Sequence, residues 1–420
     1  MNEPVAALGQ FNGHLHMMQT YCTTWGMGEQ SFEYWTWLSK QYRIFADIVD
    51  AAVQHGFKIP IPTAYMMNQP TGNTADGCNP GAILQHPGFY YHLAAMCCAE
   101  RRRRFLEVDK CEDAKDSNTA WGALVSAERQ VDHSALTIDL LTKSYEQFKK
   151  YRNTRMTLYL AAEIAGTYYE TSEYEMALKF FERIGKTYRK EQWHMVLASI
   201  LRWSLRCAKE MGSWERAVEC LVELLSSNLP MSDQKRQDIQ KELWDIIHRE
   251  SDQQQEPIQL DIQMDQINPL LTCQLQFKSR ANFVNTHVPF QVTLHTGTNS
   301  PLQPLRFSAM RIMFNDPKYN CILKDIGNDG DLASLVYVDC TKDMTTIDQG
   351  EYAGWHTKQV DLRVIKNQTI VFEGLVIPKE CEELKVMYIK PIIRIVFLKD
   401  PWIRLLAYTL TSIPHSGMSA

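Results

Sequence analysis

Tyr174-Glu175-Met176-Ala177 and, 40 residues later, Trp214-Glu215-Arg216-Ala217 are the matching stretches that decide the fold of the first half. Each follows a short turn that contains serine, Ser172-Glu173 before the first and Gly212-Ser213 before the second. This arrangement is typical of tetratricopeptide repeats, in which two helices joined by a tight turn cross at a small residue. Regular repeats recur at about 34 residues, so the longer spacing predicts degenerate helix pairs. Stacked pairs of this kind form a solenoid with an extended surface for partners. The positions expected to define the repeat are Ile164, Tyr168, Ala177, Phe181, Trp214 and Ala217.

Apolar residues at spacings of three and four predict further amphipathic helices in the same half. We expect them over residues 31–52, 86–105, 132–151 and 231–248. Pro87 suits the first turn of the second of these helices. The run Arg101-Arg102-Arg103-Arg104 is expected to end that helix, where cations meet the negative end of the helix dipole.

The character of the sequence changes near residue 251. Short alternating runs broken by Pro, Gly, Asn and Asp follow, which predicts strands. We expect strands at 259–262, 272–277, 290–294, 307–314, 335–338, 359–365, 369–372, 392–397 and 403–409. Short strands separated by turn signals predict an immunoglobulin-like antiparallel β-sandwich. The predicted division is a helical solenoid over 1–250, a polar linker over 251–257, a sandwich over 258–413 and a tail over 414–420.

Composition excludes several classes of protein. The chain has 420 residues with 44 Lys+Arg and 49 Asp+Glu, and its formal net charge of −5 argues against a general nucleic-acid binder. No apolar run reaches the roughly 18 residues of a membrane span, and we expect no signal peptide. The 11 cysteines include no Cys-x-x-Cys pair, which favours the reducing cytosol.

The motifs that resemble catalytic or ligand sites are incomplete. Gly185-Lys186-Thr187 looks like the end of a phosphate-binding loop, but Phe180 stands where its first glycine belongs, so we interpret Gly185 as a helix stop. His14-x-His16 has no Asp, Glu or Cys at supporting spacing and does not predict a metal site. We therefore expect no cofactor, no metal and no catalytic group, and predict that the chain is not an enzyme.

Arg101, Arg102, Arg103 and Arg104 form the one sharp charge run in the sequence. Residues in a helix are about 100° apart around its axis, so four consecutive side chains cannot all face one buried partner. One interpretation is a solvated cluster near a helix end. The other is an electrostatic contact with an acidic neighbouring subunit or with anionic lipid.

Stretches in both halves of this sequence resemble a known family. Residues 37–48 (Trp-Leu-Ser-Lys-Gln-Tyr-Arg-Ile-Phe-Ala-Asp-Ile) and 86–95 (His-Pro-Gly-Phe-Tyr-Tyr-His-Leu-Ala-Ala) look like the foie gras domain of the TRAPP vesicle-tethering complexes, and 155–228 is similar in the same register. Residues 306–320 look like the first β-domain of that family. Members of the family are longer, so we expect a fragment, a partial gene model or a shortened form.

The resemblance implies a non-enzymatic scaffold subunit of a cytosolic assembly at early secretory membranes. Its implied partners are other TRAPP subunits and, indirectly, Rab GTPases, with roles in ER-to-Golgi transport and autophagy. Its implied location is cytoplasmic and peripheral at the Golgi or the ER–Golgi intermediate compartment. A coat- or adaptor-like cargo binder is the alternative, and it would need an exposed apolar groove on the sandwich.

Overall fold

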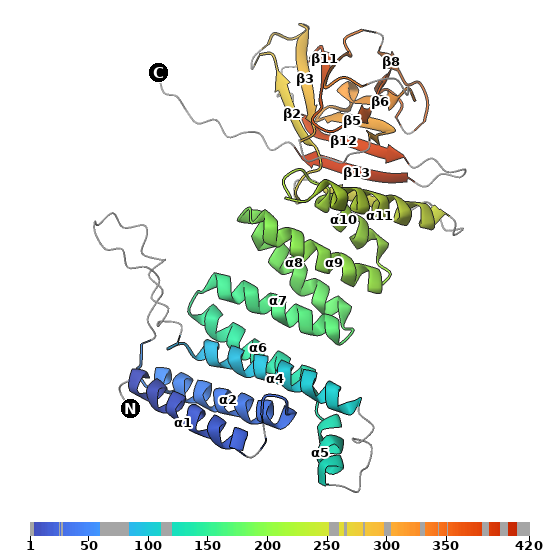
Figure 1. Ribbon diagram of the computed structural model, residues 1–420. Coiled ribbons are helices and arrows are strands. Elements are labelled where there is room, and N and C mark those ends of the chain that lie inside the picture. Colours follow the sequence, from blue (N-terminus) through green and yellow to red (C-terminus); the bar gives the residue numbers. More distant parts are fainter. Residues whose placement is uncertain are drawn as a thin grey trace. The chain divides into compact units, whose positions relative to one another are not determined.

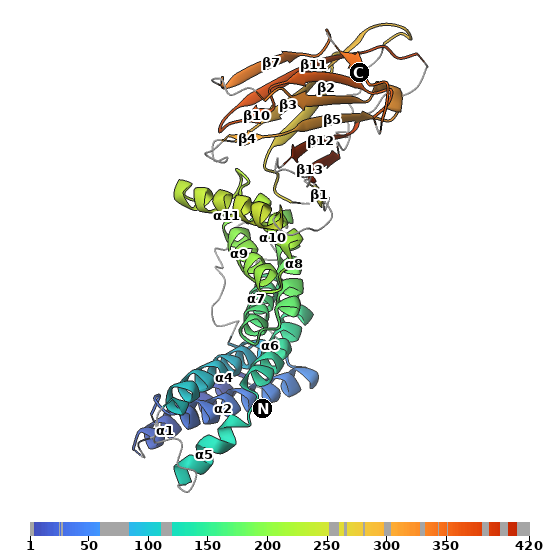
Figure 2. The same ribbon diagram turned by 90° about the vertical axis from the view of Figure 1, so that its right-hand side faces the viewer.

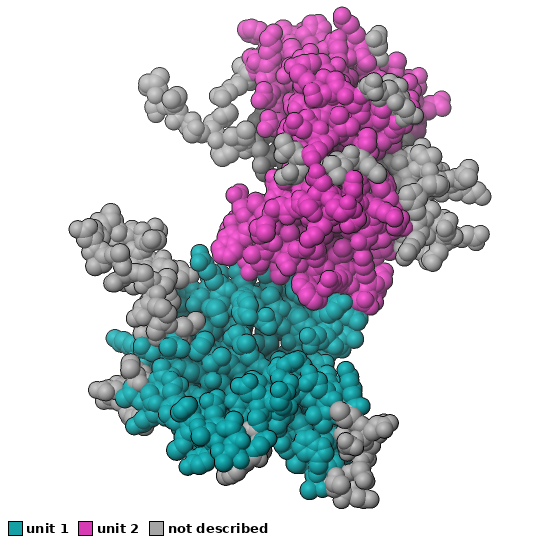
Figure 3. Space-filling view, viewed as in Figure 1, with its two compact units in different colours: residues 1–184 teal, residues 185–420 magenta. Residues whose placement is uncertain are grey.

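The computed structural model of the protein describes most of the chain (Figure 1). The described residues are 4–24, 26, 28–58, 84–110, 120–251, 260–263, 267–279, 282–297, 304–327, 332–342, 344–350, 352–379, 386–394 and 402–409. They form two compact units, residues 1–184 and residues 185–420, which Figure 3 colours teal and magenta. Each unit is described by itself below. Of the predicted linker, residues 252–257 lie outside the described residues, as does the predicted tail over 414–420.

Helices occupy the described residues up to Ser251. Their bounds are α1 Pro4–Thr24, α2 Phe32–Gln54, α4 Pro87–Asp109, α5 Ala120–Arg129, α6 His133–Lys150, α7 Thr154–Glu170, α8 Tyr174–Lys190, α9 His194–Glu210, α10 Trp214–Leu224 and α11 Asp233–Ser251. The predicted helices at 31–52 and 132–151 are confirmed as α2 and α6. Ser31 caps α2 by accepting from the Glu33 N–H, and Asp132 caps α6 by accepting from the Ala135 N–H at 2.9 Å.

Two interpretations of helix ends are wrong. α4 continues to Asp109, and its last turn holds no basic residue, so the four arginines do not meet the negative end of its dipole. Gly185 lies inside α8 rather than at a helix stop. The helices α1 and α5 were not predicted, because the apolar stripe of α1 is weak and α5 is only 10 residues long.

The turns between consecutive helices repeat every 20 residues. Arg152, Ser172, Gln192 and Gly212 have φ of 56°, 64°, 58° and 67°, the left-handed conformation. At each turn the N–H of this residue donates to the carbonyl three residues back, and the next N–H donates to the carbonyl five residues back. That pair of bonds is the Schellman motif, which satisfies the last carbonyls of a helix. The sequence showed the 40-residue helix pair but not this 20-residue unit.

Sequential packing of helices builds the core of the first unit. The buried residues Phe45, Tyr90, Leu140, Phe148 and Leu160 come from α2, α4, α6 and α7. α1 joins them through Phe11, whose ring stacks on Phe45 at 4.0 Å between centroids.

Strands occupy the described residues after Leu260. Their bounds are β1 Leu260–Gln263, β2 Thr272–Phe277, β3 Val288–His295, β4 Leu305–Arg306, β5 Ala309–Phe314, β6 Cys321–Asp325, β7 Leu335–Asp339, β8 Thr345–Thr346, β9 His356–Val360, β10 Arg363–Val364, β11 Thr369–Val376, β12 Val386–Arg394 and β13 Trp402–Thr409. Within this part of the chain they form a seven-stranded sheet in the order β1-β13-β12-β5-β6-β9-β8 and a four-stranded sheet in the order β2-β3-β11-β7. A short β10-β4 pair completes the set. The predicted α-plus-sandwich fold class is confirmed.

The sheets are mixed rather than wholly antiparallel, which corrects one part of the prediction. β1 pairs with β13, β6 with β9 and β7 with β11 in parallel, while the other pairings are antiparallel. For β6 and β9 the reason is the path of the chain: between them it crosses to the other sheet to form β7 and then returns as the short strand β8, which is antiparallel to β9. A crossover of this kind is the connection that parallel neighbours require.

Alternating burial fixes which face of each strand lines the sandwich core. In β3, Val288, Phe290, Val292 and Leu294 are buried, and the residues between them are more exposed. Opposite Phe290 on β11 stands Gly374, where an added Cβ would lie 2.2 Å from the Phe290 ring. The glycine therefore makes room for the aromatic ring between the sheets.

Candidate functional site

The four arginines of the predicted charge run lie within α4, and each pairs with a carboxylate of the same unit. Arg101 binds Glu128 through two bonds of 2.5 and 2.7 Å, and Arg102 lies 3.0 Å from Glu170. Arg103 pairs with Glu100 and Glu107, and Arg104 lies 3.0 Å from Glu100. The hydrogen bond from Arg103 and the nearby charges lower the pKa of the Glu100 carboxyl. These acids neutralise the run within the chain, and the side chain of Arg103 is the most exposed of the four at 56%.

The Arg101–Glu128 pair is part of a buried contact among three helices. Their side chains are 11% and 8% exposed, and they join α4 to α5. The Nε2 atom of His133 on α6 lies 3.5 Å from the Glu128 carboxylate. Burial lowers the pKa of His133, because an imidazolium loses hydration there, although Glu128 opposes the shift. The short helix α5 is thus held to its neighbours by a buried charge pair, which is costly to break.

The repeat positions of the first unit lie on α7 and α8. Ile164 is 2% exposed, Ala177 is fully buried and Phe181 is 2% exposed. Tyr168 is half-buried, and its ring stacks on that of Phe180 at 5.9 Å. In the second unit, Ala217 on α10 is 2% exposed and Trp214 is half-buried. Their role at the crossing of paired helices stays a prediction.

The sequence did not indicate the most polar buried contact, which joins the helices of the second unit to its sandwich. Glu223 on α10 is 1% exposed, and its two carboxylate oxygens accept from Arg189 at 2.8 and 2.7 Å. Its Oε1 atom also accepts from the backbone N–H and from the side-chain amide of Asn268, both at 3.1 Å. One buried carboxylate therefore binds α8, on one side, and the chain just before β2, on the other.

Close backbone packing continues this contact. The hydroxyl of Ser226 donates to the carbonyl of Pro269 at 2.8 Å. A Cβ added at Gly297, just after β3, would lie 2.4 Å from the Cβ of Ser227, so only glycine fits there. We call this set the helix–sandwich joint: Arg189, Glu223, Ser226, Ser227, Asn268, Pro269 and Gly297. Figures 1 and 2 both place α10 and α11 of this unit beside β13.

A buried arginine supports the helical side of the joint. Arg236 on α11 is fully buried, and its guanidinium donates to the carbonyls of Leu225, Ser226 and Leu229 at 3.3, 3.1 and 2.5 Å. These carbonyls follow the end of α10, where the helix dipole favours a cation. Burial lowers the pKa of Arg236. The hydrogen bonds from Arg236 therefore hold in place the segment after α10 that carries Ser226 and Ser227.

Sequence reasoning missed the joint because its partners are far apart along the chain. Glu223 is separated from Arg189 by 34 positions and from Asn268 by 45. The available signal was a single acid in the apolar run from Cys220 to Leu225, since a buried charge requires a partner.

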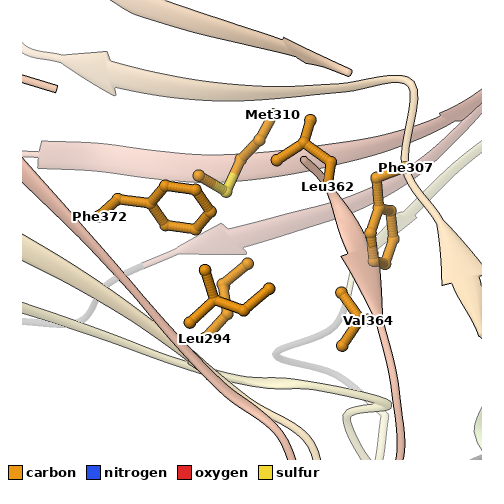
Figure 4. A pocket seen from close by; sticks show the side chains of 7 residues that line it. Leu294, Phe307, Met310, Leu362, Val364 and Phe372 are labelled. Atoms are coloured by element: carbon orange, nitrogen blue, oxygen red, sulfur yellow. The ribbon is translucent and has the colours of Figure 1, made fainter. Parts of the chain in front are cut away.

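The pocket between the sheets of the sandwich is part of its core. Leu294, Phe307, Met310, Leu362, Val364, Ile370 and Phe372 line it, and Figure 4 shows their side chains pointing toward one another. The space among them does not admit a water-sized sphere. This pocket is therefore close packing and not an exposed groove.

The described residues contain neither a cluster of metal-binding side chains nor a helix that could span a membrane. No group of three or more His, Cys, Asp or Glu side chains there could hold a metal ion. His14 and His16 are both exposed on α1. Within the same residues, no helix combines the length and the apolar character that crossing a bilayer requires.

Comparison with known proteins gives two matches to families. The profile described as Foie gras liver health family 1 matches residues 1–227, and the one described as TRAPPC11 first Ig-like domain matches residues 261–337. Among curated proteins, the chain is 25% identical over 392 residues to "Trafficking protein particle complex subunit 11" of Bos taurus, covering 79% of this chain and 32% of that protein. The Homo sapiens protein of the same name is 25% identical over 385 residues, covering 77% and 31%. The chain thus spans about a third of the length of these relatives.

Proposed function

Because the chain belongs to the Foie gras liver health family 1, we propose that it is a non-enzymatic scaffold subunit of a TRAPP vesicle-tethering complex. In this role it supports ER-to-Golgi transport and autophagy through protein–protein contacts. It binds other TRAPP subunits, acts on Rab GTPases only indirectly, and associates peripherally with early secretory membranes from the cytoplasm. The observation that carries the proposal is the order of the two family matches, 1–227 followed by 261–337, in one chain.

The architecture of the chain supports a scaffold role. Short turns that recur every 20 residues join successive helices, as in solenoids, which bind partners along extended surfaces. In the second unit the joint holds the last helices against the sandwich through Glu223 and Ser226. We further propose that the functional domains are the helical part over 1–250 and the sandwich over 258–413, connected by 251–257.

Affinity purification of the full chain tests the proposal. The chain would be expressed with a tag in cells and the co-purifying proteins identified by mass spectrometry. We expect TRAPP subunits to be enriched over a matched control purification from cells that express the tag alone. Enrichment of coat or adaptor proteins without any TRAPP subunit would overturn the proposal.

The cargo-binding alternative differs in what the sandwich must offer. A short peptide would need an exposed apolar groove beside the strands. The pocket lined by Phe307, Met310 and Phe372 does not supply one, since it is closed by core packing. No observation on the described sandwich favours this alternative over the scaffold role.

The contact role of Arg101, Arg102, Arg103 and Arg104 is part of the proposal as well. Arg102 and Arg103 are the more exposed members, at 29% and 56%. Replacing all four with Gln and measuring both liposome flotation and co-purification of subunits separates a lipid contact from a subunit contact. If the variant retains both at physiological salt, the run serves only the ion pairs within the chain.

A further inference from the structure

A stripe of cations runs along the second half of α8. Arg183, Lys186 and Lys190 are spaced three and four residues apart, so they lie within about 60° of one another around the helix axis. From 181 to 190 they are the only exposed residues of the helix. Since α8 is one continuous helix from Tyr174 to Lys190, this placement follows from the helix alone. We call these three residues the α8 stripe.

The acids of the chain do not neutralise the α8 stripe. Among the described residues, no carboxylate forms an ion pair with any of its three cations. The other two cations of α8 differ, because Lys179 pairs with Glu175 at 2.7 Å and Arg189 pairs with Glu223 in the helix–sandwich joint. The three charges of the stripe therefore face solvent.

Helix stability does not account for this arrangement. Arg183 stands three residues before Lys186 and Lys190 stands four residues after it, and like charges at these spacings destabilise a helix. Lys190 lies in the last turn of α8, where the dipole favours a cation, but the other two lie before that turn. Acids bound along the stripe would relieve the repulsion among its charges.

We propose that the α8 stripe binds an acidic helix of a partner protein. Charge complementarity is the first argument: residues 179–209 contain eight Lys or Arg and two Glu, although the whole chain has a formal net charge of −5. Spacing is the second. The three cations are separated by about 4.5 and 6 Å along the axis of α8, and acids three and four residues apart on a partner helix repeat these steps. On an extended strand, three successive residues of one side would span about 13 Å instead of about 10.5 Å.

A bilayer surface fits the α8 stripe less well. Insertion into a bilayer needs exposed apolar side chains beside the cations, and α8 exposes none from 181 to 190. This inference does not depend on the identity of the complex.

The test uses the full chain and two fluorescein-labelled, alanine-based peptides of about 20 residues, with binding measured by fluorescence anisotropy. Both peptides carry five Glu. In the facial peptide the Glu residues recur every three or four positions along one side of the helix, and in the dispersed peptide they are spread around it. Circular dichroism checks that the two peptides are equally helical. At about 50 mM salt we expect the wild type to bind the facial peptide at least about threefold more tightly than the dispersed one, and its affinity to fall as salt is raised.

The stripe variant is Arg183→Gln/Lys186→Gln/Lys190→Gln. We expect it to bind the facial peptide about tenfold more weakly than the wild type, because each exposed charge pair contributes only modestly. We expect its melting temperature to stay within a few degrees of the wild type, since all three side chains are exposed.

The matched control is Lys235→Gln/Lys241→Gln/Lys278→Gln, which removes the same charge at exposed positions on α11 and after β2. We expect the control to bind the facial peptide within about twofold of the wild type. Failure of the wild type to bind the facial peptide at about 50 mM salt, equal affinity for the two peptides, or equal losses in variant and control would each overturn the proposal.

Flotation with phosphatidylcholine vesicles that contain about 30% phosphatidylserine is the second arm. We expect the stripe variant and the wild type to float equally. Flotation of the wild type that is lost in the stripe variant, without binding of the facial peptide, would overturn the proposal and assign the stripe to membranes instead.

Discussion

Replacing Glu223 with Gln is the sharpest test of the helix–sandwich joint. The substitution keeps the shape of the side chain but removes its charge, and its amide nitrogen would meet the Nη2 atom of Arg189, donor against donor. The carboxylate now accepts two bonds from Arg189, at 2.8 and 2.7 Å, and two from Asn268, at 3.1 Å. Hydrogen bonds to charged groups contribute about 1.5–3 kcal/mol each, and breaking a buried pair typically costs about 3–5 kcal/mol. The side chain of Arg189 is 22% exposed, so water still solvates part of its charge in the variant, which places the expected loss at the lower end of this range.

We therefore expect Glu223→Gln to lower the free energy of unfolding by about 3 kcal/mol, measured by urea denaturation of the full chain. For a unit of this size, that corresponds to a fall of roughly 6–12 °C in melting temperature. The control is Glu219→Gln, one turn earlier on α10, whose pair with Arg216 is exposed. An exposed pair of this kind contributes less than about 1 kcal/mol. Equal losses in the two variants would refute the reasoning.

Four further predictions address other parts of the chain. Ala177→Trp should lower the melting temperature, because overpacking at this buried position destabilises the fold by about 1–3 kcal/mol, whereas Glu175→Gln on the exposed face should change it little. Equal effects of the two substitutions would contradict the interpretation that Ala177 lies where two helices cross. Gln192→Gly should raise the free energy of unfolding by about 1 kcal/mol, since Gln192 has φ of 58°, a left-handed conformation that glycine adopts without strain. A lower free energy of unfolding in urea denaturation would contradict this. Limited proteolysis should cut first within 251–257, and the pieces should co-elute in gel filtration because the joint holds them; first cuts inside 154–250 would contradict the domain division. Burial lowers the pKa of His86 to about 4, so below about pH 6.5 the unfolded chain takes up a proton that the folded chain does not. The free energy of unfolding should therefore fall by up to roughly 3 kcal/mol between pH 6.5 and 4. If His86→Asn shows the same dependence of this free energy on pH as the wild type, His86 is not its source.

Local patterns predicted those elements whose signals are local. Apolar spacing over 31–52 predicted α2, which is observed as Phe32–Gln54, and strict alternation from Thr272 to Phe277 gave β2 with its observed bounds. β6 was missed because Cys321, Ile322 and Leu323 are all buried, so this strand does not alternate. The repeated turns at Arg152 and Ser172 could not be predicted from the sequence, since neither residue is the glycine that usually marks such a turn.

Pairing between distant residues could not be predicted from one sequence. The arginines of α4 formed a conspicuous run, yet Arg101 and Arg102 pair with Glu128 and Glu170, which come from other helices. The same holds for Glu223, whose partners lie on both sides of the change from helices to strands. Long-range ion pairs depend on the folded geometry, and nothing in the spacing of charges along the chain specifies them.

The parallel pairing of β1 with β13 has a mechanical consequence. These are the first and last of the described strands, and Leu260, Asp261 and Ile262 are in register with Ile403, Arg404 and Leu405. If the sandwich is pulled from its two ends, β1 is drawn along its axis in one direction and β13 in the opposite direction. The bonds between them are then loaded in shear and must fail together, whereas an antiparallel terminal pair would peel apart one bond at a time. A protein stretched between two attachment points would thus have its most resistant element where the load enters and leaves the sandwich.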